Sequence, residues 1–251
     1  MNRSQPPQES TFQRGAWYDR WLVSDALEEL EAHGLEGHGR QIIQEFNRLY
    51  QRTGTLRRVA AMLAPEVRRI HAQSNRPVRV LDMSTRDGTL LHLLSGHCEG
   101  IPLELHGVEF REDIVAYAQE CCAARGDDIT IHYDPSRILA AMAPGSYDIV
   151  CSTFMLHHRT PALCSQIIAA SHKVARFRVH HFDVRRSYLA VALTWLFSTA
   201  MRFTLTRCDS VLTFRRAFRP HEMRGLIART GVPLRVRPLG PMYMMIEPSD
   251  A

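Results

Sequence analysis

Lysine is nearly absent from this 251-residue chain: Lys173 is the only lysine among 31 basic residues, so almost every positive charge is an arginine. The net charge of +5 is unevenly placed, because residues 173–251 carry 14 basic and 5 acidic side chains. Such a surface suits anionic ligands or nucleic acid. However, no block of five or more arginines and no nucleic-acid motif accompanies the bias. We therefore interpret it as a compositional preference for arginine and expect no nucleic-acid partner.

The chain also lacks an apolar run long enough to cross a membrane. The longest charge-free apolar stretch, residues 188–201, has 14 residues, whereas a transmembrane helix needs roughly 20. The first 14 residues are polar and do not show the basic-then-apolar order of a signal peptide. Six cysteines without a CxxC pair are sparse for a secreted fold held by disulfides. A reduced cytoplasmic protein without a membrane span is expected.

Composition is otherwise ordinary, with 45% apolar and 23% charged residues, which excludes disordered and low-complexity classes. Residues 1–15 are predicted to be a disordered lead. Residues 16–73 show apolar stripes at helical spacing and are predicted to form a helical cap, in which Pro65 opens a further turn or helix. Residues 74–251 are predicted to form the main domain.

From Val78 onward, short apolar runs alternate with helical stretches. The predicted strands are residues 78–83, 103–108, 129–133, 147–152 and 177–182, and the helices between them are residues 89–95, 113–125, 136–142 and 161–172. A long apolar helix over 188–206, a helix over 220–230 and a hairpin of residues 234–237 and 242–246 complete the chain. This order indicates an α/β fold with a parallel sheet covered by helices on both faces, ending in an antiparallel hairpin.

Candidate ligand-binding residues stand where the predicted strands end, because doubly wound sheets bind ligands at the carboxyl ends of their strands. Asp82 ends the first strand and leads into a helix N-terminus that can receive an anion. Glu109 ends the second strand, where an acidic residue commonly accepts ribose hydroxyls. Asp134 ends the third, and His157 and His158 follow the fourth.

In their order and spacing these residues resemble the class I S-adenosylmethionine-dependent methyltransferases, closest to the small-molecule enzymes of the ubiquinone/menaquinone and polyketide-tailoring type. The resemblance covers about residues 17–247 and implies a Rossmann-like, mostly parallel seven-stranded sheet. The motifs that carry it are Val80-Leu81-Asp82 with Gly88, Gly107-Val108-Glu109, Asp134, Ser146-Tyr147-Asp148-Ile149-Val150 and Met155-Leu156-His157-His158.

The resemblance implies S-adenosylmethionine as cofactor and a small-molecule acceptor bound beneath the helical cap and residues 188–206. Asp82 and Gly88 would hold the methionine end of the cofactor, Glu109 the ribose and Asp134 the adenine. Each acidic residue also has an ordinary structural interpretation. Asp82 could cap the next turn, Glu109 could belong to the acidic cluster that opens the following helix, and Asp134 could begin an Asp-Pro turn.

One departure from the family concerns its first loop, Asp-x-Gly-x-Gly-x-Gly. Here the three glycine places hold Ser84, Arg86 and Gly88. The Arg86 side chain could point outward, pair with a ligand carboxylate, or fill the cofactor pocket. The leading prediction is methyl transfer to a small aromatic, quinone-like or polyketide-derived metabolite. The alternatives are a catalytically inactive methyltransferase-like partner protein, or a tailoring enzyme that uses the pocket for a different reaction.

His157 and His158 are candidate general bases, because histidine titrates near neutral pH. Methyl transfer is an in-line displacement that orientation alone can accelerate, so a general base is not required. We therefore favour the interpretation that one of the two histidines is packed in the interior and the other lines the pocket. His180 and His181 face opposite ways along a strand, and no metal site is expected. The apolar segment 188–206 is interpreted as a lid and an interface with a second copy or a partner enzyme, with a buried core helix as the alternative.

Overall fold

The computed structural model describes residues 39–133, 142–198 and 204–250. The predicted lead, residues 16–38 of the predicted cap, Asp134 and most of the predicted helix 136–142 lie outside the described residues.

A seven-stranded sheet forms the centre of the molecule, with the strand order β3-β2-β1-β4-β5-β7-β6. Its strands are β1 (Val78–Asp82), β2 (Leu103–Glu109), β3 (Ile129–Tyr133), β4 (Tyr147–Thr153), β5 (Ala175–Val184), β6 (Leu234–Leu239) and β7 (Tyr243–Pro248). The first five run parallel to one another, and β7 pairs antiparallel with both β5 and β6. The predicted fold class is therefore confirmed. Because the winding direction reverses between β1 and β4, the carboxyl ends of these two strands mark the place where such sheets bind ligands.

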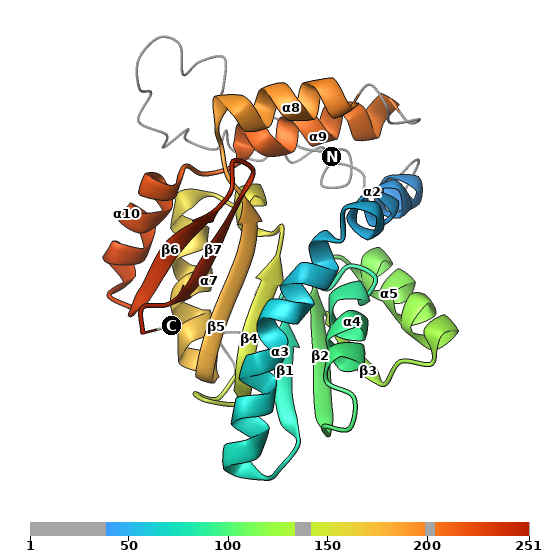
Figure 1. Cartoon of the computed structure of the whole chain (residues 1–251), viewed down its shortest axis with the longest axis vertical. Helices are drawn as coiled ribbons and strands as arrows, with labels where there is room; N and C mark the ends of the chain where they lie inside the picture. The colour runs from blue at the N-terminus through green and yellow to red at the C-terminus, as the bar shows by residue number, and fades with distance from the viewer. Residues whose placement is uncertain (1–38, 134–141, 199–203, 251) are drawn as a thin grey trace, which may run out of the picture.

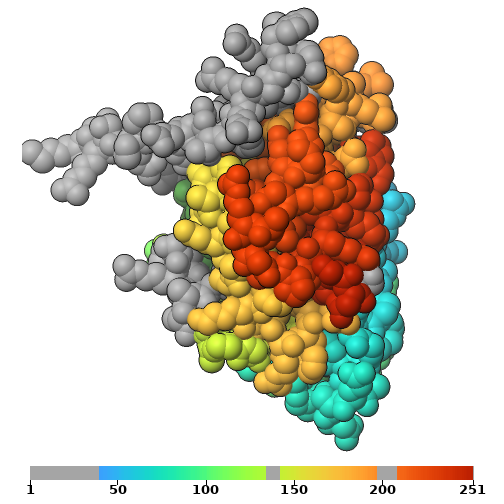
Figure 2. Space-filling model, turned by 90° about the vertical axis from the view of Figure 1, so that its left-hand side faces the viewer, coloured from blue at the N-terminus to red at the C-terminus, as the bar shows by residue number. Residues whose placement is uncertain are grey.

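Helices cover both faces of the sheet (Figure 1). The helices that flank it are α3 (Thr55–Ser74), α4 (Thr89–His97), α5 (Glu112–Arg125), α7 (Pro161–Val174) and α10 (Pro220–Thr230). Helix α2 (Gly39–Thr53) packs against α3, and the short 3₁₀ turn η2 (Leu156–His158) follows β4. α3 packs against β1 and α4, α5 packs against β2 and β3, and α7 packs behind β4 and β5 beside α10. Seen from the side in Figure 2, α10 and the β6–β7 hairpin form the centre of the surface in orange and red.

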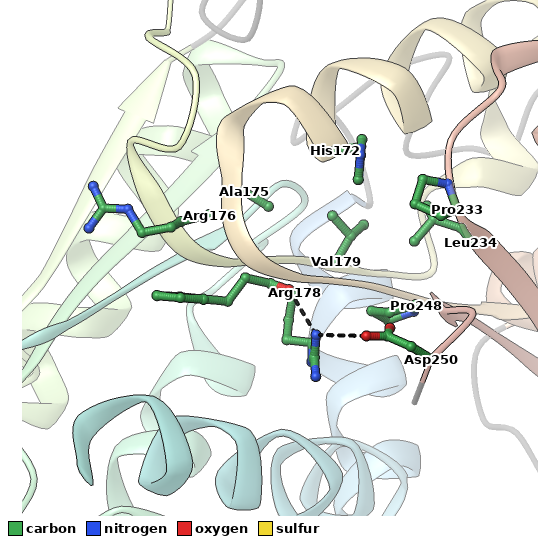
Figure 3. Close-up of a pocket in the computed structure, with 10 residues that line it drawn as sticks. His172, Ala175, Arg176, Arg178, Val179, Pro233, Leu234, Pro248 and Asp250 are labelled. Carbon is green, nitrogen blue, oxygen red and sulfur yellow. Dashed lines mark hydrogen bonds and ion pairs between the residues drawn. The ribbon is translucent and has the colours of Figure 1, made fainter. Parts of the chain in front are cut away.

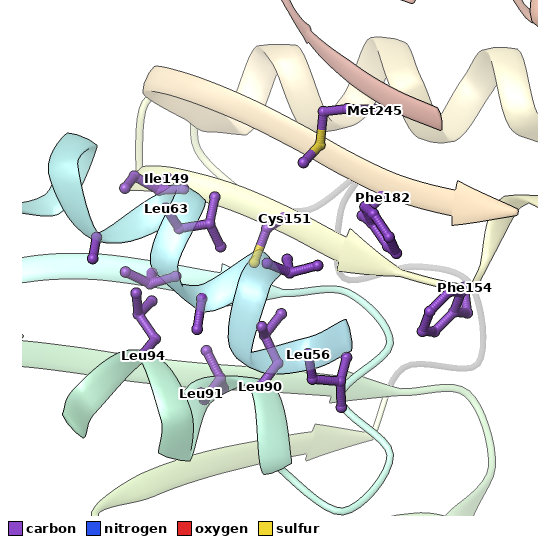
Figure 4. Close-up of a cluster of buried hydrophobic side chains, with 14 of the residues drawn as sticks. Leu56, Leu63, Leu90, Leu91, Leu94, Ile149, Cys151, Phe154, Phe182 and Met245 are labelled. Atoms are coloured by element: carbon purple, nitrogen blue, oxygen red, sulfur yellow. The ribbon is translucent and has the colours of Figure 1, made fainter. Parts of the chain in front are cut away.

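Two apolar cores, one on each face of the sheet, hold these layers together. The first joins α3 and α4 to the strands through side chains that include Leu56, Leu63, Leu91, Leu94, Ile149, Cys151 and Phe154 (Figure 4). The second joins α7 and α10 to the opposite face through Ile168, Met223 and Met244, among others. The alternation of side chains along each strand sends neighbouring residues to different cores: Val150 belongs to the second and Cys151 to the first.

The prediction that Pro65 opens a new element is wrong, because α3 runs from Thr55 to Ser74 with Pro65 inside it. A proline in a helix interior removes one backbone hydrogen bond and costs about 3 kcal/mol. Apolar residues on both sides of it, Leu63, Ala64, Val67 and Ile70, are all at most 1% exposed. Their burial outweighs the local cost.

The prediction of one apolar helix over 188–206 is also wrong. Two helices, α8 (Tyr188–Ser198) and α9 (Thr204–Arg216), pack against each other above the strand ends (Figure 1). In α8 the small residues Ala190 and Thr194 are buried, whereas Trp195 is 66% exposed. Tyr188, Leu189 and Leu196 are also more than half exposed. The four side chains just named are therefore not those of a buried core helix. Within the described residues no helix has the length and apolar character that crossing a membrane requires.

Candidate functional site

The loop that follows β1 lies against the carboxyl end of β2. The backbone N–H of Thr85 donates to the Val108 carbonyl at 3.2 Å, and the N–H of Arg86 donates to the Glu109 carboxylate. A Cβ atom on Gly107 would lie 2.6 Å from the Thr85 side chain, so glycine at this place lets the loop approach the strand. Gly88 has a φ of +78°, and a Cβ there would lie 2.6 Å from the Cys122 sulfur. The last glycine of the motif thus lets α4 and α5 pack closely.

Arg86 occupies the second glycine place of the motif and keeps a glycine-like backbone, with φ 51°. Its side chain is directed across the strand ends, not away from the molecule. The guanidinium carbon lies 5.7 Å from the ring centre of Tyr50 on α2 and 5.6 Å from that of Phe154, which follows β4. Of the three possibilities for the Arg86 side chain, an outward orientation does not fit these two contacts. Ser84, at the first glycine place, is half-buried, and its N–H donates to Asp82 at 3.3 Å.

Asp82 and Glu109 end adjacent strands as buried carboxylates, 1% and 5% exposed. Burial is the main cause that raises the pKa of Asp82 to about 7, and burial likewise raises the pKa of Glu109. Neither residue makes an ion pair with any residue that the structure describes. The Asp82 Oδ2 atom and the Thr85 hydroxyl, both buried, have no hydrogen-bond partner among the described residues. Two such carboxylates are costly to bury, which is typical of a binding site.

Asp87 anchors the end of this loop, a role that the sequence interpretation missed. Its carboxylate accepts hydrogen bonds from the Asn47 side chain on α2 at 2.7 Å and from the Thr89 hydroxyl at 2.8 Å. Its backbone carbonyl accepts from Arg125 on α5 at 2.6 Å. Asp87 therefore ties α2 to the loop. The only sequence signal was its place beside Gly88, where an acidic residue suits a helix N-terminus.

His157 and His158 differ in their surroundings. The His157 side chain is 1% exposed, and its Nδ1 atom lies 2.6 Å from the Asp183 carboxylate at the end of β5. Asp183 also accepts the backbone N–H groups of His157 and Val184. These contacts, His157 foremost, lower the pKa of Asp183 against the effect of burial. His158 is half-buried, with its ring centre 3.9 Å from that of His157. Asp183 is a second residue that sequence analysis did not single out.

His180 and His181 point to opposite faces of β5, and burial lowers the pKa of each to about 4. The His181 ring bonds to the Ser152 hydroxyl at 2.8 Å. In the part of the chain that the structure describes, no three His, Cys, Asp or Glu side chains are grouped as metal ligands. Asp134, the predicted adenine partner, lies outside the described residues.

A hollow of about 190 Å³ lies at the opposite end of the parallel strands, where β5 begins (Figure 3). Its lining includes His172, Arg176, Arg178, Pro233 and Asp250. Two of these residues, Arg178 and Asp250, form an ion pair at 3.8 Å (Figure 3). None of the predicted site residues lines this hollow, so the strand carboxyl ends remain the candidate site.

Comparison with known proteins finds likeness in structure alone. No family model and no curated protein sequence matches the chain. The plantazolicin methyltransferase BpumL in complex with S-adenosylhomocysteine superposes with a TM-score of 0.63 at 10% identity, over 92% of this chain and 95% of that one. The magnesium protoporphyrin IX methyltransferase of Synechocystis, also with bound S-adenosylhomocysteine, gives 0.52 at 16% identity over 92% of each chain. A putative O-methyltransferase from Nostoc punctiforme gives 0.57 at 14% identity, over 90% of this chain and 64% of that one.

This chain has the class I methyltransferase fold. The residues at its strand ends fit the cofactor that the resemblance implies. A buried Asp82 oxygen without a donor among the described residues suits the ammonium group at the methionine end of S-adenosylmethionine. A buried carboxylate at Glu109, without an ion pair among the described residues, suits neutral hydroxyl donors such as those of a ribose.

Proposed function

We propose that this protein transfers the methyl group of S-adenosylmethionine to a small aromatic, quinone-like or polyketide-derived metabolite. The observation that supports this most is the pair of buried carboxylates, Asp82 and Glu109, on adjacent strand ends of a class I methyltransferase fold. Together they suit a ligand with hydroxyl and ammonium donors, and an aminoacyl nucleoside has both. When bound, the cofactor supplies an electrophilic methyl group on sulfur.

In this proposal the chain itself binds and orients the two reactants. Glu109 accepts hydrogen bonds from the ribose hydroxyls, Asp82 binds the ammonium group, and Asp134 accepts a hydrogen bond from the amino group of the adenine. α8 and α9 lie over the strand ends and form a lid above the acceptor (Figure 1). His157 is held by Asp183 and shapes the site. His158 is the more accessible of the two histidines, so it is the one that contacts the acceptor. Orientation of this kind is a major source of acceleration in a displacement reaction.

The test is calorimetric titration with S-adenosylmethionine and with S-adenosylhomocysteine. We expect the parent protein to bind both, and Glu109→Gln to lower affinity at least about tenfold, because bonds to a charged acceptor contribute about 1.5–3 kcal/mol each. The control is Glu112→Gln: Glu112 is an exposed residue three positions away on α5, and its removal should leave affinity unchanged. Methyl transfer is then assayed on a panel of phenols, hydroquinones and β-dicarbonyl compounds.

The competing possibility is a catalytically inactive protein that keeps the fold and binds a partner through α8. The Arg86 side chain, which lies across the strand ends, is the observation in its favour. A parent protein that binds neither nucleoside at millimolar concentration would support this alternative and refute methyl transfer. Binding without turnover on any acceptor of the panel would favour a different reaction in the same pocket.

A further inference from the structure

The hollow at the start of β5 lies where the antiparallel ladder between β5 and β7 stops (Figure 3). The last paired residues are His181 and Ile246, although β5 begins at Ala175 and β7 continues to Pro248. Continued in the same register, the ladder would place Pro248 opposite Val179. Proline has no backbone N–H to donate to a neighbouring strand. The ladder therefore does not extend through Pro248, and a hollow remains between the two strands.

One part of the lining is apolar and rigid. Val179 and Leu234 are 2% and 8% exposed and belong to the second core, and Pro248, which is also buried, lines the hollow with them. Core side chains and proline rings are fixed in place, so a ligand meets a wall that is already formed. Sites for drug-sized ligands measure about 300–1,000 Å³. A hollow of about 190 Å³ suits a smaller body, such as a short branched chain or one aromatic ring.

Arg178 gives the hollow a positive charge that its protein partners use only in part. Its side chain is 17% exposed, its Nε atom lies 3.3 Å from the Glu66 carboxylate, and its Nη1 atom donates to the Phe177 carbonyl at 3.2 Å. A guanidinium group has five N–H donors in one plane. The Nη2 atom of Arg178 makes no hydrogen bond to any residue that the structure describes. Arg178 can therefore bind an anion without releasing Glu66.

Asp250 occupies the place of such an anion only loosely. Its carboxylate lies 3.8 Å from the Nη1 atom of Arg178, and its side chain is 75% exposed. This distance is longer than a hydrogen bond, and an exposed ion pair of this kind contributes little to stability. A carboxylate from solution can replace Asp250 and make the shorter, two-pronged contact that arginine forms with carboxylates.

The charges around the hollow favour an anion over a cation. Arg176, Arg178 and Asp250 are the lining residues with a full charge at neutral pH, so one positive charge is in excess. Arg176 is exposed and lies 3.8 Å from Asp148, a carboxylate that Arg76 already holds through both oxygens. Arg176 therefore adds to the positive potential at the rim.

We propose that this hollow binds a small carboxylic acid, whose apolar body packs on Val179, Leu234 and Pro248 and whose carboxylate pairs with Arg178 in place of Asp250. The hollow lies at the start of β5, whereas the candidate site lies at the carboxyl ends of the strands. The acid is thus a second ligand of the protein, distinct from the cofactor and the methyl acceptor, and the inference does not depend on the proposed function.

The experiment compares carboxylic acids with their uncharged amides. Benzoate and isovalerate carry a charge and an apolar body, benzamide and isovaleramide carry the body alone, and acetate carries the charge with a single methyl group. Each is titrated into the full chain, labelled on its valine and leucine methyl groups, and followed by nuclear magnetic resonance. Shifts of the Val179 and Leu234 methyl signals report binding in the hollow, and their dependence on concentration gives the affinity.

Two variants change the partners of the carboxylate. Asp250→Asn removes the resident anion from an exposed position, and Arg178→Gln removes the cation. The control is Asp128→Asn, because Asp128 is an exposed acid directly before β3, and its replacement changes the net charge of the protein equally. A melting curve verifies that each variant folds. If Arg178→Gln, which also loses the contact with Glu66, does not fold, Asp250→Asn decides the question alone.

We expect benzoate and isovalerate to bind at least about tenfold more tightly than their amides, because a charge-assisted pair is added. Acetate should bind more weakly than either, because it lacks the apolar body. Asp250→Asn should tighten both acids about two- to fivefold, since an exposed ion pair no longer competes, and should leave the amides unchanged. Arg178→Gln should abolish the preference for acids over amides. Asp128→Asn should change no affinity by more than about 1.5-fold, because salt screens distant charges.

Four results would overturn the inference. Equal affinity for acids and amides would leave an apolar hollow without a carboxylate site. Unchanged or weaker binding of the acids by Asp250→Asn would mean that Asp250 does not occupy the position of a ligand. Binding that leaves the Val179 and Leu234 signals unmoved would place the acids elsewhere on the protein. Absence of binding at millimolar concentration would reject the site outright. Each of these results leaves the binding of S-adenosylmethionine, which the proposed function predicts, as a separate question.

Discussion

Replacement of Asp82 by asparagine should stabilise the protein without ligand and weaken its cofactor binding. Burial raises the pKa of Asp82 from an ordinary 3.8 to about 7, so the folded state favours the protonated carboxyl group more strongly than the unfolded state does. The contribution of Asp82 to the stability of the parent is therefore fully present below about pH 4, and it is lost as the pH rises towards and through 7. The amide introduced by Asp82→Asn would remain neutral, and its oxygen could still accept the Ser84 N–H.

The size of the effect follows from the shift in pKa. Each pKa unit corresponds to about 1.4 kcal/mol, so the three-unit shift sets an upper bound of about 4 kcal/mol on the gain at pH 8. Between pH 5 and pH 8 the advantage of Asp82→Asn should grow by about 2–3 kcal/mol. For a domain of this size that equals roughly 5–10 °C in melting temperature. Urea unfolding of the parent and of Asp82→Asn at pH 5, 6.5 and 8 measures this difference in unfolding free energy.

Replacement of Asp148 is a control for which we expect the opposite change in stability. It is also 1% exposed, but Arg76 holds both its oxygens at 2.6 and 2.7 Å, and this contact keeps its pKa below the ordinary value. Asp148→Asn should therefore destabilise the protein at pH 8, by more than about 1 kcal/mol. The reasoning is refuted if the difference between parent and Asp82→Asn does not vary with pH, or if the parent is the more stable protein at pH 8.

Three further outcomes are expected. Gly88→Ala should cost about 1–3 kcal/mol in urea unfolding, because φ is +78° and the new Cβ would meet the Cys122 sulfur; a neutral result would show that α4 and α5 can separate freely. Asp183→Asn should destabilise by about 3–5 kcal/mol through loss of the buried charge beside His157, and a melting temperature equal to that of the parent would contradict this. Trp195→Ala should change the unfolding free energy by less than about 0.5 kcal/mol, since the side chain is 66% exposed, yet weaken acceptor binding more than cofactor binding; loss of folding instead would reject the lid.

Much of the fold was predictable from sequence because its signals are local. The strand over 129–133 and the helix over 220–230 match the structure to the residue, since apolar alternation, Pro220 at the helix start and Gly231 after its end act over a few neighbours. The helix through Pro65 was not predictable in this way. Whether a helix continues past a proline depends on how much apolar surface it buries against α4 and β1, which are distant in sequence.

The sequence by itself determined which residues end the parallel strands, and so that Asp82 and Glu109 share one edge of the sheet. Only the tertiary structure decided how they are surrounded. The structure places Asp82 in a buried position where one of its oxygens has no hydrogen-bond donor among the described residues. It also brings Asp183 against His157, and Arg86 onto Tyr50 and Phe154, from elements separated by at least 26 residues. The orientation of α8 was likewise hidden, because a helix that is apolar on every side carries no periodic signal to show which face packs. Side-chain charge and spacing are local properties, whereas burial and partnership arise only when distant segments meet.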